Sequence, residues 1–150
     1  MSEKIVEIKT FSEDMLLFVS KLTRQLTNQQ KSTSEDAFRE ILEAPNSHLL
    51  VIHDDTGAPA GMTTVGIYRT PTGCKAWIED VVVDNDARGK GYGKKIVEHA
   101  IEFIRKKGAS TISLTSNPTR LAANKLYQTL GFEKYETNVY RIRYLQSHHC

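Results

Sequence analysis

Residues 77–93 read WIEDVVVDNDARGKGYG and join an apolar run to a turn that contains three glycines. The run Val81, Val82, Val83 consists of β-branched residues, which favour a buried strand. A pattern of helical period begins near Gly91. Glycine lowers the stability of a helix or strand interior. Three glycines at this junction therefore indicate a turn that needs left-handed backbone or close approach to a ligand.

The turn has the properties of an anion site. The first amides of a helix have no partner inside the helix, and the helix dipole is positive there, so a helix N-terminus binds phosphate readily. Cationic and glycine residues surround that end, namely Arg88, Gly89, Lys90, Gly91, Tyr92, Gly93 and Lys94 in chain order. This composition predicts a pyrophosphate site, and the alternative is a tight strand-to-helix turn that binds nothing.

Two common phosphate motifs do not fit this turn. A P-loop would need glycine where Arg88 stands and serine or threonine where Lys95 stands. The dinucleotide fingerprint G-x-G-x-x-G would need its third glycine one residue later than Gly93. Thr111 occupies the place, about 20 residues on, where an acidic ribose ligand is wanted. The sequence therefore disfavours both a P-loop protein and a dinucleotide-binding protein.

The pattern of apolar residues predicts an α/β domain with the order βααβββαβαββ. Ser12 and Ser34 are suited to cap the first two helices. Strands are predicted over 4–10, 47–55, 60–69, 75–83, 110–116, 132–137 and 138–144, and helices over 13–27, 35–44, 91–107 and 117–130. The sheet is then mixed and mostly antiparallel, with at least one parallel pair made by the crossover helix 91–107. We expect a single domain over 1–145 and a frayed tail over 146–150.

Composition excludes several classes of function. The net charge of +2 gives no reason to expect a nucleic-acid partner. No stretch approaches a signal peptide or the ~20 apolar residues of a membrane span, so we expect a cytoplasmic protein with no membrane partner. The two cysteines, Cys74 and Cys150, are expected to be free thiols. No metal site is expected, because the run His148, His149, Cys150 lies at the chain end.

The stretch Arg88 to Gly93 matches the pattern R-x-x-G-x-G, and at this point the sequence resembles the GNAT superfamily of acetyl-CoA-dependent N-acetyltransferases. The resemblance runs from about Trp77 to Phe132, since NPTRLAANKLYQTLGF at 117–132 is similar to the second conserved block of that family. It implies the GNAT fold, acetyl-CoA as cosubstrate, and a glycine turn that binds the coenzyme A pyrophosphate. It also implies that the strand of Val81, Val82 and Val83 splays from the next strand and that its backbone binds the pantetheine arm.

Glu79 is the candidate general base. Strict alternation places Glu79 with Val81 and Val83 on one face and Asp80 with Val82 on the other. A lysine-like amine has a pKa near ~10.4 and is mostly protonated at pH 7, so a carboxylate that takes its proton assists attack on the thioester. We favour Glu79 over Asp80. The alternatives are a chain of water molecules as the base and a merely solvated acid.

Tyr127 is the candidate general acid, and Asn124 and Asn117 are candidate cofactor ligands. Helical spacing places Ala122, Leu126 and Leu130 on the predicted core face and puts Tyr127 with Asn124 on another stripe. The resemblance implies that Tyr127 protonates the departing thiolate and that Asn124 hydrogen-bonds the cofactor. Asn117 either caps the helix or touches the cofactor. For Tyr127 the alternative is a half-buried aromatic residue whose hydroxyl is satisfied.

The sequence as a whole predicts an enzyme that transfers acetyl from acetyl-CoA to a primary amine by direct attack in a ternary complex. The alternative is a regulatory module of the same fold that binds acyl-CoA without turnover. The acceptor stays open among a protein N-terminus, a lysine, a polyamine and a small-molecule amine. Whether the chain forms a homodimer also stays open.

Overall fold

The structure is a computed structural model that describes residues 3–30 and 32–144. It divides into two compact units, residues 1–115 and residues 116–150, which are described separately below. The predicted tail at 146–150, together with His148, His149 and Cys150, lies outside the described residues. Of the two cysteines, the structure describes Cys74, which is a free thiol. Among the described residues, no helix is both long enough and apolar enough to cross a membrane.

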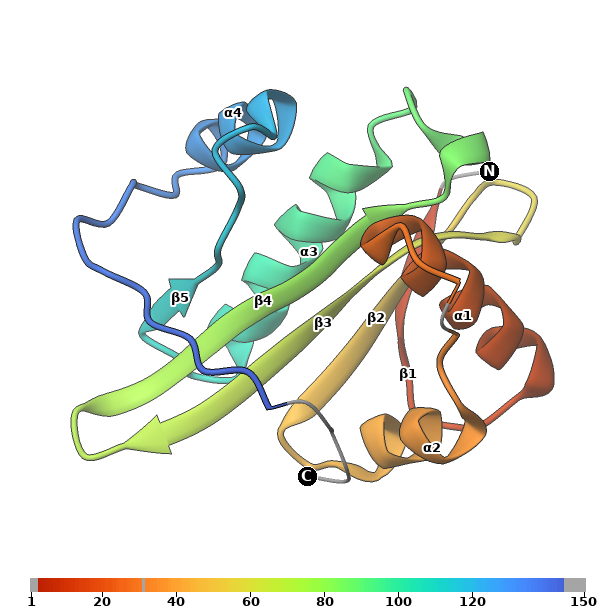
Figure 1. The fold of residues 1–150 in the computed structure, drawn as a ribbon, viewed down its shortest axis with the longest axis horizontal. Coiled ribbons are helices and arrows are strands. Elements are labelled where there is room, and N and C mark those ends of the chain that lie inside the picture. The colour runs from red at the N-terminus through yellow and green to blue at the C-terminus, as the bar shows by residue number, and fades with distance from the viewer. Residues whose placement is uncertain (1–2, 31, 145–150) are drawn as a thin grey trace. The chain divides into compact units, whose positions relative to one another are not determined.

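The first unit contains a five-stranded sheet with the order β1-β2-β3-β4-β5 (Figure 1). The strands are β1 (Lys4–Ile8), β2 (Ser47–His53), β3 (Pro59–Thr70), β4 (Gly73–Val83) and β5 (Thr111–Ser113). The first three pairings are antiparallel, and β4 pairs with β5 in parallel. The predicted mixed, mostly antiparallel sheet is therefore confirmed.

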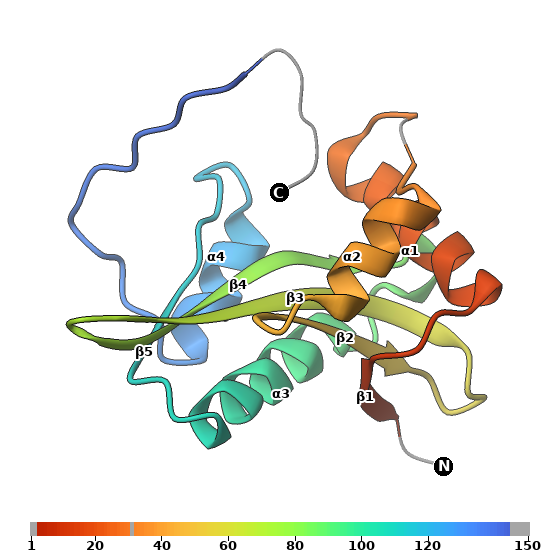
Figure 2. The same cartoon turned by 90° about the horizontal axis from the view of Figure 1, so that it is seen from below.

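Three helices of this unit cover the two faces of the sheet. α1 (Glu13–Thr27) and α2 (Glu35–Glu43) lie on one face and α3 (Tyr92–Lys106) on the other (Figure 2). The predicted caps are confirmed, because Ser12 Oγ accepts from the Met15 amide at 3.2 Å and Ser34 Oγ accepts from the Ala37 amide at 3.1 Å. Each cap satisfies one amide that the first helical turn leaves without a partner.

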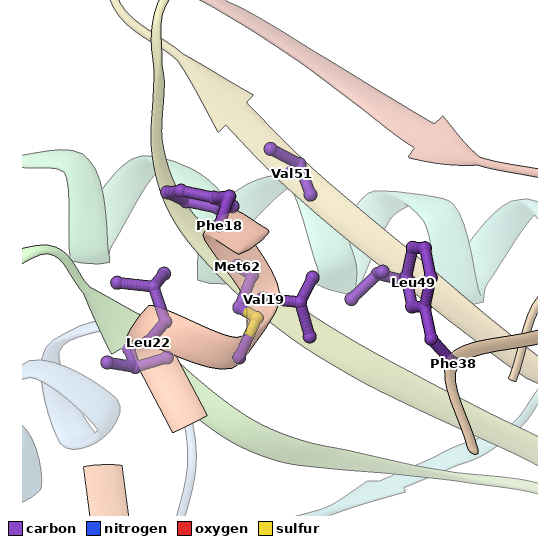
Figure 3. Packing of buried hydrophobic residues seen from close by; sticks show 8 residues of the cluster. Phe18, Val19, Leu22, Phe38, Leu49, Val51 and Met62 are labelled. Carbon is purple, nitrogen blue, oxygen red and sulfur yellow. The ribbon is translucent and has the colours of Figure 1, made fainter. Parts of the chain in front are cut away.

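Apolar side chains fill the space between the sheet and the helices on both faces. On the α1 and α2 face, eight buried residues form one cluster, most of which Figure 3 labels: Phe18, Val19, Leu22, Phe38, Leu49, Val51, Met62 and Val82. On the other face, α3 lies against β2, β3 and β4. Its buried stripe consists of Ile96, Val97, Ala100 and Ile104, as the period of 3.6 residues predicted.

The second unit contains α4 (Leu121–Thr129), which is shorter than the helix predicted over 117–130. The predicted closing strands at 132–137 and 138–144 are wrong, since residues 132–144 form no helix or strand. Strand formation requires a neighbouring strand and a buried face. The apolar side chains of this segment have neither support, because Tyr135, Val139, Tyr140, Ile142 and Tyr144 are 72% to 88% exposed. The observed order is βααβββαβα.

Candidate active site

β4 carries a bulge in the middle of its pairing with β3. Thr64 lies opposite Glu79, and Met62 lies opposite Val82. One residue therefore separates the paired positions on β3, whereas Asp80 and Val81 separate them on β4. Asp80 has φ +53°, a left-handed conformation that residues other than glycine adopt infrequently. Bulges of this kind re-aim side chains and are frequent beside active sites.

The bulge changes the face on which Glu79 lies. Residues directly opposite each other in an antiparallel pair share a face, and so do residues two apart on one strand. Because Met62 and Thr64 share a face, Glu79 and Val82 share it too. Strict alternation had placed Glu79 with Val81 and Val83, and that prediction is wrong. Its physical cause is the extra residue at Asp80, which reverses the alternation along β4.

A buried threonine holds the backbone at the bulge. Thr63 is fully buried, and its hydroxyl donates to the Glu79 carbonyl oxygen at 2.8 Å. This bond satisfies a carbonyl that the disrupted ladder would otherwise leave without a partner. The Glu79 backbone is therefore fixed where its side chain leaves the sheet.

Both acids at the bulge hold their protons more strongly than isolated carboxyls do. Each residue keeps more than a third of its surface exposed, yet nearby protein atoms remove part of the solvent around its carboxylate. Burial raises the pKa of Glu79, and the neighbouring charge of Asp80 raises it further. Burial alone raises the pKa of Asp80. A carboxylate whose pKa moves toward neutrality is a better general base at physiological pH.

β5 leaves much of β4 without a partner on that side. Among the described residues, the two strands pair only between Lys75–Trp77 and Thr111–Ser113. From Ile78 to Val83, β4 keeps β3 as its neighbour. This short pairing agrees with the predicted splay of the two strands. The backbone of Val81, Val82 and Val83 can therefore hydrogen-bond an extended ligand along this edge.

The glycine turn has the backbone that an anion site needs. Gly89 and Gly91 have φ values of +82° and +80°, and a Cβ built on either would meet nothing within 4 Å. Gly91 is the N-cap of α3 and provides no side-chain cap. The first helical bond runs from the Lys95 amide to the Gly91 carbonyl oxygen, so the amides of the three residues between them have no acceptor within the helix. Open space and unpaired amides thus meet where pyrophosphate binding is predicted.

The side chains of the turn point in different directions. Tyr92 is 6% exposed, so its backbone amide rather than its ring is available to a ligand. The Arg88 Nε donates to the Val83 carbonyl oxygen at 3.5 Å, which places its guanidinium beside the end of β4. Lys95 pairs with Glu3, whereas Lys90 and Lys94 are exposed. These cations supply the positive charge that the sequence predicted around the turn.

Asp84 helps to position the glycine turn, although the sequence did not single it out. It is 8% exposed and follows Val83 directly. Lys21 Nζ donates to Asp84 Oδ2 at 2.8 Å, and Gln25 Nε2 donates to Oδ1 at 3.1 Å. Burial opposes ionisation of Asp84, but the hydrogen bonds from Lys21 and Gln25 outweigh it and lower the pKa of this carboxyl. The network joins α1 to the first residue after β4 and so positions the glycine turn.

In the second unit, the two predicted asparagine ligands bond to each other and to the turn before α4. Asn117 Oδ1 accepts from the Thr119 amide at 2.9 Å and from its hydroxyl at 2.8 Å. Asn124 Nδ2 donates to the carbonyl oxygens of Asn117 at 2.9 Å and Arg120 at 2.8 Å. Asn117 therefore stabilises the turn before the helix, and the N-cap of α4 is Arg120.

Tyr127 is the buried residue of α4, which corrects the predicted stripe. It is 7% exposed, whereas Ala122, assigned to the core face, is exposed. The Tyr127 ring meets that of Phe132 edge-on, with 6.1 Å between centroids. Leu126 and Tyr127 project about 100° apart on the helix, and the spacing of apolar residues alone does not say which of these two directions is covered by other residues. Burial raises the pKa of the Tyr127 phenol, which keeps it protonated and able to donate.

The chain is similar to known proteins both in sequence and in fold. A sequence model described as "Acetyltransferase (GNAT) family" matches residues 16–132. A thialysine N-epsilon-acetyltransferase from Sus scrofa is 34% identical over 119 residues, which cover 74% of this chain and 68% of that protein. The crystal structure of glucosamine-6-phosphate N-acetyltransferase from Arabidopsis thaliana is 26% identical, with a TM-score of 0.76 over 97% of this chain and 100% of that one.

A more distant structure shares the fold alone. An aminoglycoside acetyltransferase from an uncultured soil metagenomic sample superposes with a TM-score of 0.82 at 17% identity, over 96% of this chain and 97% of that one. The chain fold is therefore shared with proteins whose sequences have diverged widely.

Proposed function

The chain belongs to the GNAT family of acetyltransferases, and from that premise we propose that it transfers the acetyl group of acetyl-CoA to a primary amine by direct attack in a ternary complex. Family membership makes the chain an acetyl-CoA-dependent acyltransferase that acts on amines. The bulge at Asp80 is the observation that carries the proposed mechanism, because it brings Glu79 onto the α1 and α2 face while β4 keeps a free edge.

The glycine turn and the free edge of β4 bind the cosubstrate in this proposal. The turn amides and the cations Arg88, Lys90 and Lys94 hold the pyrophosphate. The backbone of Val81, Val82 and Val83 holds the pantetheine arm, so that the thioester lies along β4 near the bulge. Asn117 and Asn124 are proposed as further ligands of the cosubstrate.

The reaction needs two proton transfers. The amine nitrogen forms a bond to the thioester carbonyl carbon, and the carbon–sulfur bond breaks, with its electron pair leaving on sulfur. Glu79 takes the proton that the nitrogen loses, directly or through water. Tyr127 gives its proton to the thiolate and regains one from solvent, and Glu79 releases the proton it took to solvent. The products are the N-acetylated amine and coenzyme A, and the enzyme returns to its starting state.

The test of this function is thiol release from acetyl-CoA with a panel of primary amines, followed by Glu79→Gln. We expect the variant to lose most activity at low pH, where few amines are neutral, and to approach wild-type activity as pH rises toward the amine pKa. Asp80→Asn is the matched control: it should keep the activity that Glu79→Gln loses, with its profile displaced toward lower pH, because the Asp80 charge no longer raises the pKa of Glu79. A Glu79→Gln profile that runs parallel to the wild type would remove Glu79 as the base.

Binding of acetyl-CoA without thiol release from any amine would support the regulatory module instead. Relatives named for thialysine and for glucosamine-6-phosphate are similar to this chain, so amines of both chemical types belong in the panel. Calorimetry with coenzyme A separates loss of binding from loss of turnover.

A further inference from the structure

Six residues form a strip along the β3–β4 hairpin, on the face that α1 and α2 partly cover. The pairs Thr64–Glu79, Gly66–Trp77 and Tyr68–Lys75 lie opposite each other with no shift in register between them, so all six side-chain positions share one face. It is the face of Met62 and Val82, which pack under α1 and α2. Figure 2 shows that the far end of the hairpin extends beyond α1 and α2. We call these residues the hairpin strip.

The middle of the hairpin strip is aromatic and fixed in orientation. Trp77 Nε1 donates to the Tyr68 hydroxyl oxygen at 3.1 Å, which orients the two rings relative to each other. Tyr68 is 41% exposed. A Cβ built on Gly66, directly opposite Trp77, would meet nothing within 4 Å. The strip therefore has an open apolar surface at its centre, on which the carbon chain of a ligand can lie.

The ends of the hairpin strip carry opposite charges. Glu79 lies at the bulge end, and Lys75 lies toward the tip of the hairpin. Within residues 3–30 and 32–144, no ion pair engages either side chain. Their Cα positions lie four residue steps apart along β4, which is about 13 Å, and a chain of about six carbons with a hydrogen bond at each end spans such a distance.

We propose that the hairpin strip binds the acceptor, and that this acceptor is a primary alkylamine with an anionic group at its other end. This proposal rests on the function proposed above and names the substrate class of the same site. The amine reaches Glu79 at the bulge, the carbon chain lies on Trp77 and Tyr68, and the carboxylate or phosphate at the far end pairs with Lys75. A diamine would bring a second cation against Lys75 and is therefore a poorer acceptor.

Charge reversal at Lys75 tests the orientation. The probes are 6-aminohexanoate, aminohexyl phosphate, hexylamine and 1,5-diaminopentane, each with saturating acetyl-CoA. We expect the wild type to prefer the two anionic amines, and the better of these two identifies the anion. Lys75→Glu should lower kcat/KM for the anionic amines by roughly tenfold or more and raise it for the diamine. Arg69→Glu is the matched control, because Arg69 pairs with Cys74 on the opposite face of the same hairpin.

Gly66→Val tests the aromatic centre without harm to the fold. The backbone of Gly66 is not left-handed and the space above it is open, and valine suits a strand better than glycine does. We expect an unchanged or higher melting temperature together with a rise of roughly tenfold in KM for the acceptor and an unchanged KM for acetyl-CoA. An unchanged acceptor KM in this folded variant would overturn the proposal that the hairpin strip binds the acceptor.

Fluorescence gives a readout that does not depend on turnover. Trp77 is the single tryptophan of the chain, so a change of emission on titration with 6-aminohexanoate reports on the strip directly. If titration changes the emission but no amine is acetylated, the strip stands and the proposed function fails. If amines are acetylated but Lys75→Glu and Arg69→Glu give the same selectivity among them, the hairpin strip does not bind the acceptor and the proposed function stands. Absence of both signals with every probe overturns the strip as an acceptor site.

Discussion

Lys21 and Asp84, which lie 63 residues apart in the sequence, form an ion pair with 2.8 Å between Nζ and Oδ2. Gln25 extends this link, because its Oε1 accepts from the Asn85 amide at 3.0 Å. One turn of α1 thus holds both the side chain of Asp84 and the backbone of the next residue. The start of the glycine turn is consequently anchored to α1.

Asp84→Asn should weaken both folding and cosubstrate binding. Loss of a buried, charge-assisted interaction costs about 1–3 kcal/mol, and we expect the lower part of this range because Lys21 is 47% exposed and partly screened by solvent. Coenzyme A affinity should fall as the turn loses its anchor. Asp86→Asn is the control, since Asp86 lies 4.0 Å from Lys21 with a side chain 90% exposed. Denaturant unfolding and calorimetry on both variants measure the two effects.

The pH dependence of this contribution has a definite sign. The pKa of Asp84 is lowered in the folded protein, so its stabilising effect is present above the pKa of the unfolded state, near ~3.9, and is lost as pH falls through the folded pKa. The difference in unfolding free energy between wild type and Asp84→Asn should therefore shrink under acid. A difference that stays constant from neutral pH to strong acid would show that the ionised carboxylate is not the stabilising species.

Gly91→Ala should remove coenzyme A binding at a modest cost in stability. An alanine at φ +80° is strained by about 1–2 kcal/mol, and its methyl group would enter the space that the pyrophosphate is predicted to occupy. Gly108→Ala is a matched control, because Gly108 has φ +91° and equally open surroundings at the far end of α3. Both variants should melt at similarly lowered temperatures, and only Gly91→Ala should lose affinity. Equal affinity in the two folded variants would exclude the turn as the pyrophosphate site.

Asp80→Asn should stabilise the protein at neutral pH. Burial raises the pKa of Asp80, so the folded state favours the protonated form, and stability declines as pH rises from the unfolded pKa through the folded one. Asparagine removes this penalty and tolerates the left-handed backbone at φ +53°. The gain should be visible at pH 7 and absent near pH 3, as measured by denaturant unfolding. A loss of stability at pH 7 would mean that the carboxylate has a favourable partner.

The features that depend only on residues close together in the sequence could be predicted from it. The caps at Ser12 and Ser34 and the left-handed glycines of the turn follow from local chemistry, and the structure confirms them. The bulge at Asp80 depends on how β4 pairs with β3, and nothing within IEDVVV specifies which residue is extra. The partners of Asp84 come from α1, at sequence distances of 59 and 63 residues, and no spacing rule reaches so far.

The closing strands failed for a related reason. Alternation in residues 138–144 shows that a strand would be amphipathic, but it does not supply the strand that must pair with it. The burial of Tyr127 also depends on which side of α4 is covered by other residues, and helical spacing alone does not specify that side. In each case the sequence identified the chemical group and missed its environment.

Tyr127→Phe should lower kcat by ~10²–10³, because general acid catalysis is typically worth about 10²–10⁴. The phenylalanine keeps the ring and its edge-on contact with Phe132, so the packing of α4 should change little. Burial raises the pKa of Tyr127, and the wild-type phenol therefore stays protonated through the pH range of turnover. The loss should appear in kcat and kcat/KM alike, which is the mark of an interaction made mainly in the transition state.

The competing interpretation is that Tyr127 is only a packed aromatic residue. It predicts a lowered melting temperature with normal kcat in the protein that remains folded. Tyr135→Phe is the control for loss of a tyrosine hydroxyl in the same unit, since Tyr135 is 83% exposed, and it should leave both quantities unchanged. Steady-state kinetics and a melting curve on one preparation of each variant separate the two interpretations. Wild-type kcat in Tyr127→Phe would end the assignment of this residue as the acid, and the thiolate would then take its proton from solvent.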